Sequence, residues 1–183
     1  MKGLGTVRLE TERLVLRRIT KNDACQAFNN WTNDPETARY VTWKVHGTVE
    51  NTLKLFEMWE NEYNEPHTYR WVVEVKNLSQ IIGTIDVVHK SIRESTAEIG
   101  YCYGSKYWGN GYGTEALTKV IDYLLNEVGF ELLEARHLVT NPASGRVMEK
   151  SGMKYETILR KRIIDQYTNE RVDLKIYSIM NEK

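Results

Sequence analysis

The chain has 183 residues, of which 25 are basic and 25 acidic, so its formal net charge at neutral pH is zero. A chain of this length can bury the core of one domain, and we expect a single domain over residues 1–183. Balanced charge gives no bulk field that would draw the protein to nucleic acid or to a membrane surface. We therefore predict neither as a partner.

Cysteine usage and hydropathy indicate the compartment. The N-terminus is polar, and no uninterrupted apolar run approaches the length that spans a bilayer. Cys25 and Cys102 are far apart and lack the spacing of a metal or redox motif. A reducing, cytoplasmic location is expected. No metal is predicted, because ligand spacing is absent among the four histidines, His46, His67, His89 and His137.

The first half of the chain is predicted from apolar periodicity and capping residues. Thr20 with Asp23 three positions later suits a helix N-cap, and Thr48 can cap a second helix. The predicted elements are a strand over 9–19, a helix over about 20–34, an irregular segment over 35–47, a helix over 48–65, and strands over 69–75 and 81–88.

The second predicted helix is acidic. It carries a single lysine, Lys54, and five glutamates, Glu50, Glu57, Glu60, Glu62 and Glu65. Two interpretations remain open. The helix could hold a cationic substrate beside an active site, or it could present an ordinary solvated face with its apolar stripe in the core.

The second half alternates strands and helices. The apolar positions after Thr114 follow the three-and-four spacing of a helix with one buried face, and Gly129 suits its C-cap. The predicted elements are strands over 97–103 and 133–139, helices over 114–128 and 141–151, and closing strands over 153–159 and 172–179. The whole order predicts one α/β (α+β) domain around a mixed sheet.

Three alternating glycines, Gly109, Gly111 and Gly113, separate the strand over 97–103 from the long helix. A glycine turn before a helix N-terminus offers backbone N–H groups and a favourable dipole to an anion. A Walker loop would need Lys-Ser or Lys-Thr after the last glycine, but Thr114-Glu115 follows. The dinucleotide spacing G-x-G-x-x-G is not met either. On spacing alone, an anion site and a plain structural turn both remain open.

Three motifs in order carry a family resemblance. W-G-N-G-Y-G-T-E-A-L at 108–117 resembles the acetyl-CoA signature of GNAT acetyltransferases, in particular the RimJ/RimL-like branch of ribosomal-protein N-terminal acetyltransferases. The segment 141–153 is similar to the family pattern N-P-x-S-x-x-V-x-E-K-x-G-F, and T-E-R-L-V-L-R at 11–17 is similar to its opening strand. The resemblance extends over about residues 8–180.

The resemblance implies a fold and a donor site. The expected sheet is mostly antiparallel, with about six to seven strands and about four helices, and a splay between its fourth and fifth strands admits acetyl-CoA. The leading Gln or Arg of the general signature falls on Trp108, so phosphate binding would depend more on backbone amides. The residues expected to bind acetyl-CoA are Tyr101, Cys102, Tyr103, Trp108, Gly109, Asn110, Gly111, Tyr112, Gly113, Thr114 and Asn141.

The implied reaction is direct attack of an amine on the thioester, without a covalent enzyme intermediate. Glu98 is the predicted base, acting directly or through a water, although an ordinary surface glutamate is equally consistent. The tyrosine that many relatives carry seven residues after the asparagine is Met148 here. Ser144 is therefore the predicted acid, with a helix-start residue as the alternative. Cys102 could be a nucleophile, but a packed thiol is the simpler interpretation.

The acceptor is the open question. A protein α-amine needs less help from a base than a lysine amine, and the missing tyrosine favours a protein N-terminus as the acceptor. The alternatives are a small amine, such as an antibiotic, polyamine or amino acid, and a non-catalytic acyl-CoA-binding module. Exposed strand edges would also allow a homodimer.

Overall fold

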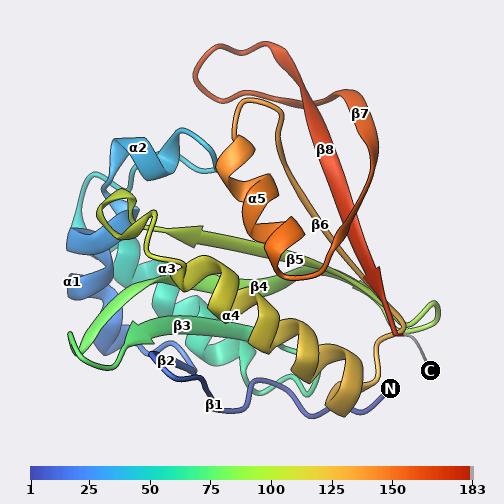
Figure 1. Ribbon diagram of the computed structural model, residues 1–183. Helices are drawn as coiled ribbons and strands as arrows, with labels where there is room; N and C mark the ends of the chain where they lie inside the picture. The colour runs from blue at the N-terminus through green and yellow to red at the C-terminus, as the bar shows by residue number, and fades with distance from the viewer. Residues whose placement is uncertain (182–183) are drawn as a thin grey trace.

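One mixed sheet of eight strands organises the chain in the computed structural model, which describes residues 1–181 (Figure 1). Residues 182 and 183, the end of the expected domain, lie outside the described part. The strand order across the sheet is β1-β2-β3-β4-β5-β6-β8-β7. The strands are Leu9–Glu10 (β1), Leu14–Arg17 (β2), Arg70–Val75 (β3), Gln80–Ser91 (β4), Thr96–Tyr103 (β5), Leu132–Leu138 (β6), Lys154–Ile164 (β7) and Arg171–Met180 (β8).

Helices cover both faces of this sheet, with α4 and α5 on one face and α1 and α3 on the other (Figure 1). The α-helices of the described residues are Ala24–Ala27 (α1), Pro35–Ala38 (α2), Val49–Glu62 (α3), Tyr112–Asp122 (α4) and Pro142–Lys150 (α5). Short 3₁₀ segments occupy Lys21–Asp23 and Ser105–Tyr107, and π-helical segments occupy Phe28–Thr32 and Tyr123–Val128.

The predicted class, a mixed and mostly antiparallel sheet with flanking helices, is confirmed. Only β5 and β6 are parallel neighbours. The expected strand count was too low because the strand predicted over 9–19 is a hairpin of β1 and β2, with Leu9 opposite Leu16. The Thr11 hydroxyl accepts the Leu14 N–H at 2.9 Å and closes the turn between them.

The segment expected to be irregular contains a short helix, α2. Pro35 occupies its first position, and the Asp34 carboxylate accepts the Glu36 N–H at 3.0 Å and caps the helix. The predicted capping box of Thr20 and Asp23 is present at the start of the first helical segment. Local side-chain bonds therefore define both helix starts.

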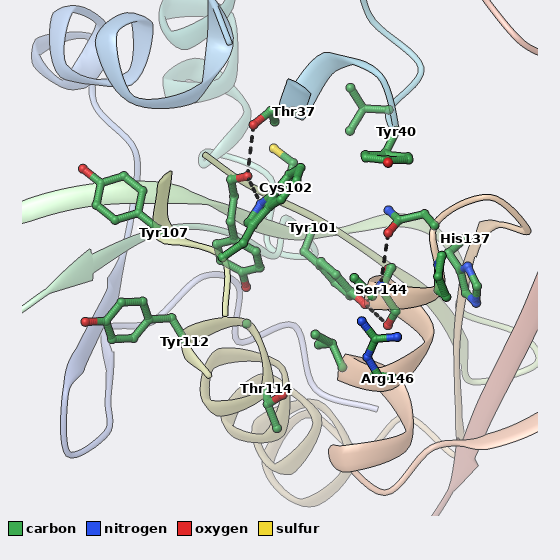
Figure 2. A pocket seen from close by; sticks show the side chains of 18 of the residues that line it. Thr37, Tyr40, Tyr101, Cys102, Tyr107, Tyr112, Thr114, His137, Ser144 and Arg146 are labelled. Atoms are coloured by element: carbon green, nitrogen blue, oxygen red, sulfur yellow. Dashed lines mark hydrogen bonds between the residues drawn. The ribbon is translucent and has the colours of Figure 1, made fainter. Parts of the chain in front are cut away.

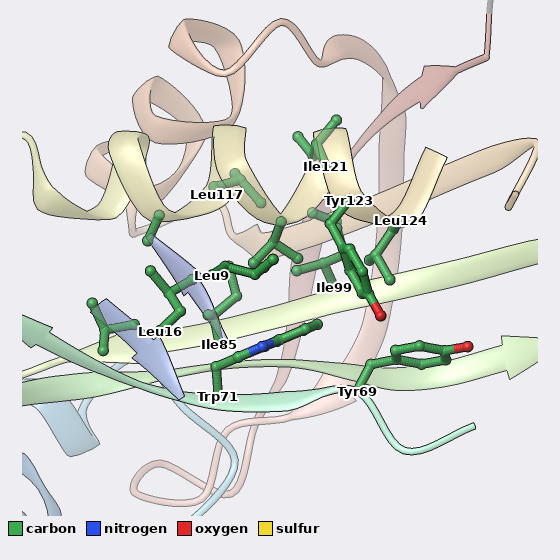
Figure 3. Packing of buried hydrophobic residues seen from close by; sticks show 14 of the residues in the cluster. Leu9, Leu16, Tyr69, Trp71, Ile85, Ile99, Leu117, Ile121, Tyr123 and Leu124 are labelled. Carbon is green, nitrogen blue, oxygen red and sulfur yellow. The ribbon is translucent and has the colours of Figure 1, made fainter. Parts of the chain in front are cut away.

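Packing of α4 against the sheet forms the main core (Figure 3). Leu117 and Ile121 of α4 are buried over Ile99 and Trp71 of the sheet. A second cluster lies on the opposite face of the sheet. It joins α3, through Phe56, to α1 and to β3. Burial of these apolar side chains is the dominant favourable term in folding, and it fixes α4 relative to β5.

The acidic face of α3 is mostly solvated. Glu62 forms an ion pair with Arg70, and Glu60 accepts the Lys21 N–H at 3.2 Å. The exposed Glu50, Glu57 and Glu65 have no ion-pair partner within residues 1–181. In the described chain, no helix is both long and apolar enough for a membrane span.

Candidate functional site

A cavity of about 610 Å³ opens where β5 and β6 diverge. The two strands pair only from Thr96 opposite Leu132 to Ile99 opposite Ala135. Beyond that point β5 continues to Tyr103, while β6 turns away toward β8 (Figure 1). The expected splay between the fourth and fifth strands is therefore present, between β5 and β6. Helices α4 and α5 and the segment after α2 complete the cavity wall.

The glycine turn lies at one end of this cavity. Gly109 and Gly111 have φ of +79° and +80°, a left-handed conformation in which a Cβ would be strained. Gly113 has a different constraint, because its Cβ would come within 3.2 Å of the Tyr103 ring. Helix α4 begins immediately after Gly111, and its first backbone N–H groups have no acceptor within the helix. The turn therefore leaves room and donors for an anion.

Two side chains hold the turn in place. The Trp108 indole donates to the Tyr103 carbonyl at 2.7 Å, which also accepts the Thr37 hydroxyl at 3.2 Å. The Asn110 amide donates to the Tyr107 carbonyl at 3.1 Å. Asn110 and Glu98 are the predicted site residues that do not line the cavity. Those that line it are Tyr101, Cys102, Tyr103, Trp108, Gly109, Gly111, Tyr112, Gly113, Thr114, Asn141 and Ser144.

Arg13, immediately before β2, supports the turn from outside and was not among the predicted site residues. Its guanidinium donates to the Asn110 carbonyl at 3.0 Å, forms an ion pair with Glu115 at 2.6 Å, and lies 4.8 Å over the Tyr112 ring. Burial raises the pKa of Glu115, but hydrogen bonds from the Thr11 hydroxyl and from Arg13 outweigh burial and leave that pKa below its ordinary value. A charged pair therefore joins β2, the turn and α4.

Helix α5 forms the facing wall of the cavity. The Asn141 carboxamide oxygen accepts the Ser144 N–H at 3.3 Å and caps the helix. Arg146 and Lys150, four residues apart on the helix, both line the cavity. They were not predicted, although their spacing within the 141–153 motif indicates a shared face. The cavity thus combines a glycine turn, a helix N-terminus and the two cations of α5.

Comparison with known proteins identifies this arrangement. The family described as "Acetyltransferase (GNAT) domain" matches residues 13–154. The chain is 31% identical to the uncharacterized N-acetyltransferase YoaA of Bacillus subtilis over 175 residues, which cover 96% of this chain and 97% of YoaA. The chain belongs to the GNAT family of acetyltransferases.

Solved structures agree with this assignment. A GNAT acetyltransferase from Bacillus anthracis has a TM-score of 0.83 and 28% identity, covering 97% of this chain and 100% of that one. Ribosomal-protein-S5-alanine acetyltransferase from Vibrio fischeri has a TM-score of 0.84 and 22% identity, covering 97% and 98% of the two chains. At that identity the second likeness shows the shared fold. The protein is an acetyl-CoA-dependent N-acetyltransferase.

Within this GNAT cavity, Tyr101 and Ser144 meet across the slot (Figure 2). The Tyr101 hydroxyl lies 2.9 Å from Ser144 Oγ and 3.0 Å from the Ser144 carbonyl oxygen. Burial raises the pKa of Tyr101 well above its ordinary value, so the phenol stays protonated at neutral pH. Met148, at the position where many relatives have a tyrosine, is buried. The two hydroxyls form a hydrogen-bonded pair at the cavity wall.

Glu98 lies beside the GNAT cavity rather than in it. Its carboxylate oxygen is 2.7 Å from Nε of Arg136, on the neighbouring strand β6. Glu98 lines a separate shallow hollow with His89 and Glu134, whereas Arg136 lines the cavity itself. A proton transferred from a cavity-bound amine to Glu98 would therefore need a bridging water.

Burial shifts the pKa values of two further titratable groups of the GNAT cavity, Cys102 and His137. Burial raises the pKa of Cys102 to about 11, and its thiol lies 3.4 Å from the Thr84 hydroxyl. A thiol that stays protonated at neutral pH is a poor nucleophile, which favours the packed-thiol interpretation. His137 is buried against Gly145 of α5, and burial lowers its pKa. No cluster of three or more metal-binding side chains occurs within residues 1–181.

Proposed function

We propose that this N-acetyltransferase acetylates the α-amine of a protein N-terminus by direct attack on acetyl-CoA. One observation carries the proposal: no aspartate or glutamate is among the described residues that line the cavity. The nearest carboxylate on β5, Glu98, is already paired with Arg136. A site without its own carboxylate base favours an acceptor that is partly neutral before it binds.

The ordinary pKa values of amines give the size of this effect. An α-amine with a pKa near 7.8 is about 30% neutral at pH 7.4, whereas a lysine amine near 10.4 is about 0.1% neutral. The α-amine thus offers about 300-fold more of the reactive form. This difference supports an N-terminal acceptor over a lysine side chain.

The chain offers the donor a suitable set of contacts. Phosphate groups fit the glycine turn, where Gly109 and Gly111 leave the space that a Cβ would fill. Arg146 and Lys150 provide cations on the facing wall. The slot between β5 and β6 suits the extended pantetheine arm. Acetyl-CoA supplies the acetyl group as an activated thioester.

Different residues around the slot carry out the two proton transfers of the reaction. The amine nitrogen forms the new C–N bond, the C–S bond breaks, and a backbone N–H near Cys102 or Tyr103 stabilises the oxyanion. Ser144 donates its proton to the departing sulfur while Tyr101, 2.9 Å away, passes its own proton to Ser144 Oγ, and the Tyr101 phenol is then reprotonated from solvent. The proton lost by the amine passes through water to Glu98.

Small amines are the second candidate class of acceptor. The charge of the cavity lining distinguishes polycationic small amines from a protein N-terminus. Its charged lining residues are Arg136, Arg146 and Lys150, and all are basic. This charge disfavours polycations such as polyamines and aminoglycosides. The shared fold of the ribosomal-protein-S5-alanine acetyltransferase supports a RimJ/RimL-like acceptor.

The test is thiol release from acetyl-CoA with a panel of acceptors at pH 7.4. Peptides beginning with Ala or Ser should be acetylated, and the same peptides with a blocked N-terminus and an internal lysine are the matched control. Faster turnover of polyamines or aminoglycosides would overturn the acceptor class. If acetyl-CoA binds but no amine accelerates thiol release, the protein is a non-catalytic acyl-CoA-binding module.

A further inference from the structure

Arg136 occupies the apex of the splay. Ala135 is the last residue of β6 that pairs with β5, and Arg136 is the first residue beyond that pairing. The buried neighbours Leu133 and Ala135 belong to the core on the α4 face. Alternation along the strand therefore directs Glu134 and Arg136 to the opposite face.

The apex is also where the reacting groups must meet. A donor arm that enters the slot from the glycine turn cannot pass Ile99 and Ala135, because the strands are hydrogen-bonded there. Tyr101, which carries the contact to Ser144, is two residues from Ile99 on the same strand. An acceptor amine that reaches this point thus comes within the neighbourhood of Arg136.

Glu98 orients the guanidinium of Arg136 through Nε alone. Its Nε contacts Glu98 at 2.7 Å, and within residues 1–181 it reaches no other acceptor. Its side chain is about one-third exposed, at 34%. An arginine held by one edge presents its two terminal nitrogens as a fork that matches a carboxylate. Because the described cavity lining contains no carboxylate, this fork has no internal competitor in the cavity.

We propose that Arg136 is an acceptor subsite for a carboxylate, so that the preferred substrate carries an amine and a carboxylate on one residue. The inference rests on the proposed amine acetylation and narrows its acceptor class. Two sources supply this chemistry: a free amino acid, and a protein N-terminus that begins with Asp or Glu. Arg146 and Lys150 lie on α5, on the facing wall of the cavity, and are proposed above to contact the donor.

A plain cross-strand ion pair predicts something different. Such a pair at a partly exposed site contributes little to stability and nothing to substrate choice. If Arg136 only pairs with Glu98, its replacement would affect every acceptor equally. If Arg136 binds the substrate, the effect would depend on the acceptor's carboxylate.

The experiment compares matched acceptors with the wild type, Arg136→Gln and Arg136→Lys. One pair is alanine and alaninamide, and the other is a short peptide that begins with Asp or with Asn. For each acceptor, the ratio of wild-type to variant kcat/KM cancels the difference in amine pKa between compounds. Arg93→Gln is the control, because Arg93 is 94% exposed in the turn between β4 and β5. Circular dichroism and thermal melting confirm that each variant is folded.

We expect Arg136→Gln to lower kcat/KM about 10- to 100-fold for the carboxylate-bearing member of at least one pair, the range for a lost charge-assisted bidentate contact. Its neutral partner should lose at least about tenfold less, because any effect of the change on Glu98, the proton acceptor that Arg136 contacts, is shared by both members of a pair. The KM for acetyl-CoA should change less than about twofold. Arg136→Lys should give a smaller loss, because lysine keeps the charge but lacks the fork. The pair that responds identifies the source, amino acid or protein N-terminus.

The opposing results are distinct. Equal losses for both members of both pairs, or a loss confined to the KM for acetyl-CoA, would overturn the subsite while leaving N-acetylation intact. Failure of every amine to release thiol with the wild type would instead remove the proposed function, and the subsite with it.

Discussion

Replacing Tyr101 with Phe tests the hydroxyl pair most directly. The change removes one oxygen, which lies 2.9 Å from Ser144 Oγ and 3.0 Å from the Ser144 carbonyl, and keeps the ring that packs in the slot. Each lost hydrogen bond is worth about 1 kcal/mol net, so the free energy of unfolding should fall by about 1–2 kcal/mol. Since 1.4 kcal/mol corresponds to a factor of about ten, an equal loss of proton-donor positioning would lower kcat about tenfold.

A double-mutant cycle gives this prediction its specificity. Ser144→Ala should lower kcat about 100-fold, the lower end of the range for general acid catalysis. Tyr101→Phe in that background should add nothing, because Tyr101 acts only through Ser144. Thiol release at saturating acetyl-CoA measures all four variants. If the two losses instead multiply to about 1,000-fold in the double variant, Tyr101 does not act through Ser144.

Tyr63→Phe supplies the matched control. The Tyr63 hydroxyl also makes two hydrogen bonds, donating to the Arg70 carbonyl and accepting the Ile19 N–H, both at 2.9 Å. Tyr63 packs against the core cluster on the face opposite α4. Its loss should therefore lower stability by a similar amount and leave kcat unchanged. A fall in kcat with Tyr63→Phe would mean that stability alone explains the effect of Tyr101→Phe.

Three further predictions follow from the same geometry. Gly111→Asp should weaken acetyl-CoA binding at least about 100-fold, because it places a carboxylate at the anion site. Gly47→Asp is the control, because Gly47 has the same left-handed backbone, with φ of +72°, and open space around it. Calorimetry should show that Gly47→Asp keeps the affinity for acetyl-CoA. Glu98→Gln should lower turnover at neutral pH and recover partly at alkaline pH, and an unchanged pH–rate profile would remove Glu98 as the base. Burial lowers the folded-state pKa of His137 below its ordinary value of 6.5. As pH falls, the unfolded chain therefore binds a proton at this histidine before the folded chain does. The contribution of the neutral His137 to stability is complete above about pH 6.5 and decreases below that value. Denaturant unfolding of His137→Gln at pH 7.5 and 5.5 should show a smaller loss than the wild type, and an equal loss would contradict this assignment.

Local patterns predicted most of the fold and the donor end of the site. The apolar spacing after Thr114 defined the long helix, and Gly129 ends it in a left-handed conformation, with φ of +91°. The turn at Gly109–Gly113 was predicted from its spacing and its place between a strand and a helix. Such features depend on residues a few positions apart, so a single sequence contains enough to identify them.

Contacts between distant residues were not predictable in the same way. Arg13 meets Glu115 across 102 positions, and no local pattern indicates that β2 begins beside the glycine turn. The strand predicted over 9–19 was wrong for a related reason, because the bond from Leu14 N–H to the Thr11 hydroxyl turns the chain where apolar alternation alone predicts an extended run. The segment after Asp34 was assigned no structure because a four-residue helix gives too little periodicity.

The direction of Glu98 shows where sequence reasoning about the acceptor ends. Alternation along β5 places Ala97 and Ile99 in the core under α4 and therefore sends Glu98 to the other face. That much follows from the sequence, but the identity of its partner does not, because Arg136 belongs to a strand that is brought alongside by the crossover through α4. The pairing of Glu98 with Arg136 changes which role Glu98 can have toward the acceptor. A lone glutamate would be a base that any amine could use, whereas a glutamate that holds an arginine at the apex orients a cation beside the reacting end of the donor. The glycine turn thus accounts for the donor, and the charge at the apex bears on which amine can approach it.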